Sequence, residues 1–267
     1  MAKCQILLTN DDGIRSPGLW AAAEALSALG FVTVAAPREQ ASGTGRSLPV
    51  ISDGIIRAET MRVHGKEWTV YAIGGTPAQA VQHGITEIMP QPPDLVVAGI
   101  NYGENVGTGV TISGTVGAAL EAASAGIPAL AMSLETEQRH HLSLSKEVDF
   151  SVAAHFTAFF ARLLLEKQMP PDVDLLKVEV PSGATPETPW RVTRVARQPY
   201  YEPLRPKRKS WDVPEKVGYH RVELLGPEHE GSDVYVLRAS KLVSVTPISL
   251  DLTSRVDFTE LDKLLRT

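Results

Sequence analysis

Asp11 and Asp12 lie next to each other directly after an apolar run that reads as a buried strand. Adjacent carboxylates repel each other, so a fold that holds them together at a strand end is best explained if a cation lies between them. A simpler interpretation is that the stretch from Asn10 to Gly13 only shapes a turn through side-chain bonds to the backbone. Taken alone, the dipeptide favours the turn. Polar residues elsewhere in the chain change that balance.

Other polar side chains also follow predicted strands at the point where each strand ends. Ser42 comes after the strand predicted over residues 31–36, and Asn101 and Asn105 follow the strand predicted over 94–99. In an open parallel sheet, ligands bind outside the carboxyl ends of the strands. We therefore expect these residues to meet Asp11 and Asp12 at one edge of the sheet.

The residue types at this edge indicate a metal. Carboxylate, hydroxyl and amide oxygens form an all-oxygen set that suits a hard divalent cation. The chain has seven histidines and one cysteine, none at the spacing of a zinc site. The sequence therefore predicts a hard divalent cation such as Mg²⁺ or Mn²⁺ at this edge of the sheet.

A second feature at the same edge is the start of an alanine-rich helix predicted over residues 113–125. Free amides at a helix N-terminus, with two hydroxyls beside them, make a seat for an anion, although a serine there is also an ordinary N-cap. A neighbouring metal favours the anion. We expect a phosphate to contact Asn105, Ser113, Gly114 and Thr115. Metal and phosphate together are typical of phosphoryl chemistry, for which Asp11 and Asp12 are the predicted catalytic residues.

The elements that must position these residues alternate along the first half of the chain. Strands are predicted at 5–9, 31–36, 69–73, 94–99 and 129–132, with helices after Ser16-Pro17, after Thr76-Pro77 and over 113–125, and a long helix over 146–167. This order predicts an α/β fold with a mostly parallel sheet and helices on both of its faces. Thr76 and Gln79 fit a capping box.

The composition shifts in the second half. Residues 186–235 are rich in proline, charge and aromatics, which predicts short antiparallel strands or an extended β-hairpin arm, followed by a strand at 242–246 and a helix from about Phe258. We predict a catalytic core over 1–185 and a C-terminal extension over 186–267.

Exposed aromatics on extended strands usually find a partner surface, so the arm and terminal helix are expected to serve oligomerisation. The alternative is that the segment folds back over its own domain. The aromatics concerned are Trp190, Tyr200, Tyr201, Trp211, Tyr219 and Tyr235.

The composition of the chain argues against several classes of function. With 267 residues and 43% hydrophobic content, the chain suits one large α/β domain. Its net charge of −5 argues against a binder of duplex nucleic acid or acidic membranes. No apolar stretch approaches the roughly 20 residues of a membrane helix. The N-terminal residues run straight into the first strand without room for a signal peptide, and Cys4 is the single cysteine, so we expect a cytoplasmic protein. His140-His141 is expected to lie in a solvated loop.

These motifs, in this order, closely resemble the SurE family, the survival-protein nucleotidases. The match is dense over residues 5–133 and thinner beyond. The matching stretches are residues 7–14, 36–43, 75–77, 99–105 and 113–119, with 244–247 and 250–253 toward the C-terminus.

The resemblance implies a metal-dependent phosphatase that hydrolyses nucleoside 5′-monophosphates, with 3′-monophosphates left open as substrates. It also implies a Rossmann-like three-layer α/β/α core and a homodimer or homotetramer built through exchanged C-terminal elements. By match, it places the ligands of one divalent metal ion per subunit, Mg²⁺ or Mn²⁺, on Asp11, Asp12, Ser42 and Asn101. The chain departs from the family pattern at Gln79, where the family has Asp, and at Ser232, where it has Thr. The capping-box role suits Gln79.

Other classes remain as alternatives. A metal-dependent glycosyltransferase also uses paired carboxylates, but it keeps a donor diphosphate on the metal. A haloacid-type phosphatase needs Asp-x-Asp after its first strand, a spacing that Asp11-Asp12 lacks. A nucleotide sensor without catalysis would use the same site residues. The sequence is compatible with attack on the phosphorus by water or by a carboxylate. We favour water activated by the metal, with Asp11 or Asp12 assisting proton transfer.

Overall fold

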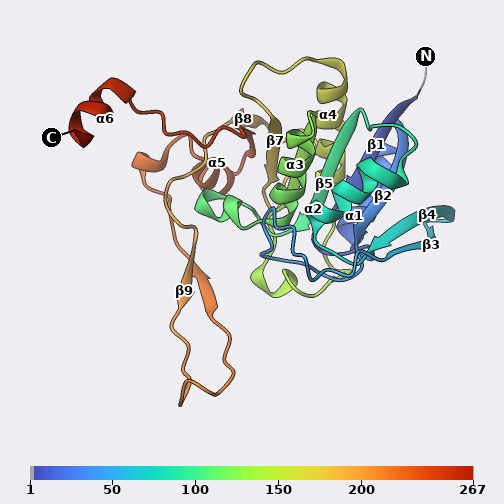
Figure 1. The fold of residues 1–267 in the computed structure, drawn as a ribbon, viewed down its shortest axis with the longest axis horizontal. Coiled ribbons are helices and arrows are strands. Elements are labelled where there is room, and N and C mark those ends of the chain that lie inside the picture. Colours follow the sequence, from blue (N-terminus) through green and yellow to red (C-terminus); the bar gives the residue numbers. More distant parts are fainter. Residues whose placement is uncertain (1–2, 267) are drawn as a thin grey trace.

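The computed structural model describes residues 3–266 and is built on one nine-stranded sheet, whose strand order is β3-β4-β2-β1-β5-β6-β7-β11-β8 (Figure 1). In chain order its strands are β1 (Cys4–Thr9), β2 (Gly30–Pro37), β3 (Ile56–Val63), β4 (Lys66–Ile73), β5 (Leu95–Tyr102), β6 (Ala129–Leu134), β7 (Leu175–Val180), β8 (Trp190–Val192) and β11 (Val243–Ile248). All neighbours pair in parallel except β3 with β4 and β11 with β7. The predicted α/β class with a mostly parallel sheet is confirmed.

Helices cover both faces of this sheet. They are α1 (Pro17–Leu26), α2 (Pro77–His83), α3 (Gly114–Ser124), α4 (Ser151–Glu166), α5 (Asp233–Arg238) and α6 (Phe258–Leu265). Side chains alternate along each strand, so Ile6 and Leu8 of β1 join the apolar cluster that α1 and α4 cover, while Leu7 joins the cluster beneath α2 and α3. The three layers are therefore α1/α4, the sheet, and α2/α3. Across residues 3–266, no helix combines the length and apolarity needed to span a membrane.

The sheet order fixes where a ligand binds. From β1 the chain runs to β2 on one side, while β5 lies on the other, so the strand order reverses between β1 and β5. Such a switch point opens a crevice at the carboxyl ends of the two strands. Asp11 and Asp12 leave β1 at that point, and Asn101 lies near the end of β5.

Several local predictions need correction. The strand predicted at 69–73 is the second part of β4, but β3 and β7 were not anticipated, because both carry charged residues in the middle of their runs. The helix expected from residue 146 begins at Ser151, where Asp149 accepts a hydrogen bond from the Ser151 amide at 2.8 Å and stops the helix from extending further back. Phe159, which the apolar spacing of this helix predicts on its inner face, is 39% exposed.

The second half forms an arm and a small cluster. Strands β9 (Tyr201–Leu204) and β10 (Gly218–Arg221) pair antiparallel, and we call residues 201–221 the hairpin arm. Figure 1 shows it projecting from the body, with α6 set apart from the sheet at the C-terminal end. Tyr200, expected to be exposed, is buried with Val106, Leu224 and residues of α5. This segment thus packs partly on its own chain.

Candidate active site

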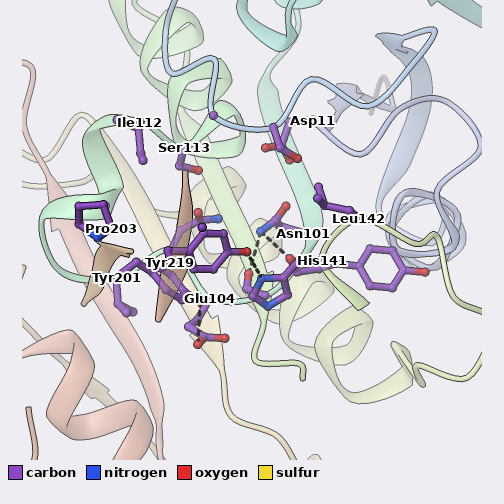
Figure 2. A pocket seen from close by; sticks show the side chains of 18 of the residues that line it. Asp11, Asn101, Glu104, Ile112, Ser113, His141, Leu142, Tyr201, Pro203 and Tyr219 are labelled. Carbon is purple, nitrogen blue, oxygen red and sulfur yellow. Dashed lines mark hydrogen bonds between the residues drawn. The ribbon is translucent and has the colours of Figure 1, made fainter. Parts of the chain in front are cut away.

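Most of the predicted site residues line one pocket at the switch point. It has a volume of about 600 Å³, within the range of about 300–1,000 Å³ that small-molecule sites occupy. Those that line it are Asp11, Ser42, Asn101, Asn105 and Ser113. Asp12, Gly114 and Thr115 are buried behind that surface. Figure 2 shows Asp11, Asn101 and Ser113 facing the same space from different elements.

Asp11 is held against the start of α3. Its side chain is buried, and the Thr115 hydroxyl donates to its Oδ1 at 2.6 Å. A Cβ on Gly114 would lie only 2.7 Å from the Asp11 Cβ, so this close approach requires glycine. Burial raises the pKa of Asp11, and hydrogen bonds from Thr115 and from the Thr115 and Gly114 amides oppose that rise.

Asp12 is fixed on both of its oxygens. Gln40 Nε2 donates to Oδ1 at 3.0 Å, and the Tyr102 amide donates to Oδ2 at 3.2 Å. Burial, and then the negative charge of Asp11, raise the pKa of Asp12 well above its ordinary value. Two buried adjacent carboxylates that resist ionisation without a counter-charge are suited to binding a cation. The donor set therefore fits the metal that the sequence predicts.

The other two predicted ligands face the same pocket. Asn101 donates from Nδ2 to the carbonyls of Tyr102 at 3.2 Å and Gly103 at 2.7 Å, which directs its amide oxygen toward Asp11 (Figure 2). Ser42 is exposed at the pocket mouth. Residues 3–266 contain no group of three or more His, Cys, Asp or Glu side chains that could hold a metal, so an ion here would rely on amide and hydroxyl oxygens and water besides the two carboxylates.

The loop that carries Ser42 is pinned to the core at both ends. The Ala41 amide donates to the Asp11 carbonyl at 2.7 Å. Arg46 Nε forms a 2.7 Å ion pair with Glu121 of α3, and Gln82 of α2 donates to the other oxygen of Glu121. Ser42 is therefore presented by an anchored loop, although its own side chain is exposed.

The predicted phosphate contacts differ in what their side chains already do. Ser113 Oγ accepts from the Val116 amide at 3.1 Å as the N-cap of α3, which leaves its hydroxyl hydrogen available on the pocket side. The Thr115 hydroxyl donates to Asp11, and the Thr115 amide faces the same carboxylate, so a phosphate would share that amide with Asp11. Asn105 is half-buried and donates from Nδ2 to Ser133 Oγ at 3.0 Å.

A buried charge cluster that the sequence did not reveal holds the Asn105 backbone from both sides. The Asn105 amide donates to Glu179 Oε2 at 2.9 Å, and Lys177 Nζ donates to the Asn105 carbonyl at 2.9 Å. Lys177 also pairs with Asp233 at 3.1 Å, and all three charged side chains are fully buried. We call Lys177, Glu179 and Asp233 the buried triad.

The triad combines one cation with two carboxyl groups in a buried environment. Burial, only partly offset by Lys177, raises the pKa of Glu179 to about 7. Asp233 accepts hydrogen bonds from the Gly107 amide at 3.2 Å and the Ala196 amide at 2.9 Å, which ties the same loop to the C-terminal half. The triad therefore links β7, α5 and the loop that presents Asn105.

The opposite wall of the pocket was also missed. It contains His141, Leu142, Tyr201, Pro203, Val217 and Tyr219. The expectation of a solvated His140-His141 loop is wrong, because His140 is 8% exposed and burial lowers the pKa of His141. Only long-range folding brings these residues beside β5, so no local signal identifies them, although the aromatic content of residues 186–235 marks the segment as unusual.

Comparison with known proteins agrees with this architecture. The family model described as survival protein SurE matches residues 6–202. A protein named 5′-nucleotidase SurE from Thermococcus kodakarensis is 42% identical, with 98% of each chain covered. One of the same name from Thermococcus gammatolerans is 44% identical, covering 98% of this chain and 96% of the relative. The crystal structure of the SurE protein from Aquifex aeolicus superposes with a TM-score of 0.75 at 31% identity, over 98% of this chain and 99% of that one.

Proposed function

This chain belongs to the SurE family, and on that premise we propose that it hydrolyses nucleoside 5′-monophosphates to the nucleoside and phosphate with the help of a divalent metal ion. It is an enzyme of the 5′-nucleotidase class, because relatives with that name are similar to it over nearly the whole length of both chains. The observation that carries the metal-dependent mechanism is the buried Asp11-Asp12 pair, which lies at the switch point against the N-terminus of α3.

We assign the metal to Asp11, Asp12, Ser42 and Asn101, and its identity to Mg²⁺ or Mn²⁺, because their donors are all oxygen. When bound, such an ion supplies charge neutralisation at the phosphoryl oxygens and lowers the pKa of bound water. The chain's own part is to hold two ionised carboxylates in a dry pocket wall, with Thr115, Gln40 and the Tyr102 amide fixing their oxygens. Asp11, which reaches the pocket, is placed to accept a proton from an attacking water.

We assign the phosphate to the start of α3. Ser113 would donate its hydroxyl. The Gly114 and Thr115 amides, which also face the Asp11 carboxylate, lie at the helix N-terminus, where a negative charge is favoured. Asn105, whose backbone is held by the buried triad, would donate from the facing loop. These donors are fixed before substrate arrives, so they stabilise the charge that develops during transfer without reorganising.

The phosphate assignment predicts a specific soaking result. Phosphate or vanadate diffused into crystals should lie within hydrogen-bond distance of Ser113, the Gly114 and Thr115 amides and Asn105. Ser113→Gly keeps a tolerated N-cap residue while deleting the hydroxyl, so it should raise KM about tenfold with little loss of stability. An anion located away from residues 113–115 would contradict the assignment.

A nucleotide sensor is the alternative without catalysis. It would bind the same ligand through the same residues but release no phosphate. Assay of phosphate release against a panel of 5′-monophosphates and one 3′-monophosphate separates the two. The proposed function expects turnover on the 5′ series, whereas a sensor gives binding with no turnover on any member.

We also propose that the protein is at least a homodimer. No residue of α6 is buried, and the apolar side chains of Leu252, Phe258 and Leu265 are 93%, 62% and 76% exposed in a single chain. Trp211 at the tip of the hairpin arm is 92% exposed. Surfaces of this kind usually pack on a partner.

Assembly through the C-terminal segment gives a direct prediction. The intact protein at micromolar concentration should have a mass, measured by light scattering, of at least twice that of the chain. Removing residues 250–267 should shift the mass to that of a monomer or make the chain insoluble. A monomeric mass for the intact protein would contradict the assembly.

A further inference from the structure

The pocket has two chemically different ends. One end carries Asp11, Asn101, Asn105 and Ser113, the polar groups assigned to metal and phosphate. The other is walled by the hairpin arm, the loop around residue 141 and Ile112, and is mainly apolar and aromatic. A ligand that fills both ends must combine an anionic group with a flat or apolar one.

The aromatic wall is built as a rigid stack anchored on one buried carboxylate. Glu104 is 3% exposed, and its Oε1 accepts from the hydroxyls of Tyr200 at 2.9 Å and Tyr201 at 3.0 Å. Arg221 forms a 2.9 Å ion pair with the same oxygen. Burial and then the Glu104 charge raise the pKa of both tyrosines, so their hydroxyls remain protonated donors. The inner rings of the wall are therefore fixed.

Tyr219 is the outermost ring of this stack. It packs edge-on against Tyr201, with ring centroids 5.1 Å apart, and its hydroxyl lies 3.3 Å from His141 Nδ1. It lines the pocket and remains 36% exposed, which leaves ring surface open to a ligand. In Figure 2 its ring projects between the arm and the residue 141 loop.

We propose that the hairpin arm supplies the nucleobase subsite of its own chain, with Tyr219 as the specificity-determining residue that stacks on the base; this rests on the proposed function. Every nucleobase can stack on an aromatic ring, because every base has a π-face whatever hydrogen-bonding groups its edge carries. The subsite therefore favours nucleotides over phosphomonoesters without a base, and purines over pyrimidines because their stacking area is larger. The arm then has a role in substrate choice besides its role in assembly.

The test compares two substrates that share a ribose phosphate. For Tyr219→Ala, the ratio of kcat/KM for adenosine 5′-monophosphate to kcat/KM for ribose 5-phosphate should fall about tenfold, mainly through KM for the nucleotide. Tyr219→Phe keeps the ring and should restore the ratio to within about twofold. Trp211→Ala, which removes an exposed aromatic of the same arm outside the pocket lining, is the matched control and should leave the ratio unchanged. Equal losses on both substrates, or no loss on either, would overturn the proposal.

Binding of adenosine separates this inference from the proposed function, because adenosine has no phosphate and is not turned over. Calorimetry should find that the wild-type protein binds adenosine and that Tyr219→Ala binds it at least about fivefold more weakly. Equal dissociation constants overturn the subsite. A wild-type protein that binds adenosine in this way but releases no phosphate from any nucleotide would contradict the proposed function and leave the subsite standing.

Discussion

Asp11→Asn and Asp12→Asn should each reduce phosphate release by at least about 10³-fold while the chain stays folded. The metal contributes several kcal/mol to stabilising the charge of the transition state, and 1.36 kcal/mol corresponds to about tenfold in rate. Removing one carboxylate removes half of the formal charge that binds the ion. The measurement is kcat/KM for a nucleoside 5′-monophosphate at saturating Mn²⁺ or Mg²⁺.

The same substitutions make a distinct prediction for the protein without metal. The folded-state pKa of Asp12 is raised, so its contribution to stability is fully present below about pH 4, its unfolded value, and is lost as pH rises through the folded pKa. Asparagine does not ionise. The melting temperature of Asp12→Asn relative to wild type, measured with chelator, should therefore be higher at pH 8 than at pH 5.

The control for both measurements is Glu67→Gln, which neutralises an exposed carboxylate on β4 that is not among the site residues. It should change neither activity nor the pH dependence of melting. Wild-type activity in both Asp11→Asn and Asp12→Asn would refute the metal assignment. A melting difference that does not change with pH would refute the electrostatic account of the pair.

Lys177→Met is expected to have the largest effect on stability. It leaves Glu179 and Asp233 buried without their cation and the Asn105 carbonyl without its donor. Breaking a buried ion pair on one side costs about 3–5 kcal/mol, and each kcal/mol lowers the melting temperature of a protein of this size by about 2–4 °C. We expect a drop of about 10 °C by calorimetry, together with a higher KM because the Asn105 loop loses its anchor.

Two further variants distinguish the electrostatic cause from lost packing. Lys177→Met combined with Glu179→Gln removes one of the uncompensated charges and should recover part of the lost stability. Lys66→Met, at an exposed position of β4, should leave the melting temperature within about 1 °C, as surface substitutions usually do. A drop in melting temperature of less than 2 °C for Lys177→Met would show that the buried triad does not stabilise the loop that contains Asn105.

The sequence was most informative where local signals were strong. Asp11 and Asp12 come shortly after the apolar residues 6–8 of the first strand, and the Thr76–Gln79 capping box is present in the structure with both of its hydrogen bonds. Because a parallel sheet brings the carboxyl ends of its strands to one edge, strand order alone sufficed to gather Asn101 and Ser113 beside them.

The features that were missed depend on contacts between distant segments. Lys177 and Glu179 alternate with apolar residues in β7 and look like the exposed face of an edge strand, yet both are fully buried because Asp233 arrives from 56 positions later in the chain. Tyr219 has no polar or apolar pattern around it that indicates a pocket wall. Only the pairing of β9 with β10 and the anchoring on Glu104 place it there.

Release of inorganic phosphate from adenosine 5′-monophosphate, with and without chelator, is the decisive measurement of metal-dependent hydrolysis. Purified protein should release phosphate with Mn²⁺ or Mg²⁺, lose that activity in excess chelator and regain it when either ion is restored. Undiminished release in excess chelator, or no release from any nucleoside 5′-monophosphate with either ion, would contradict it.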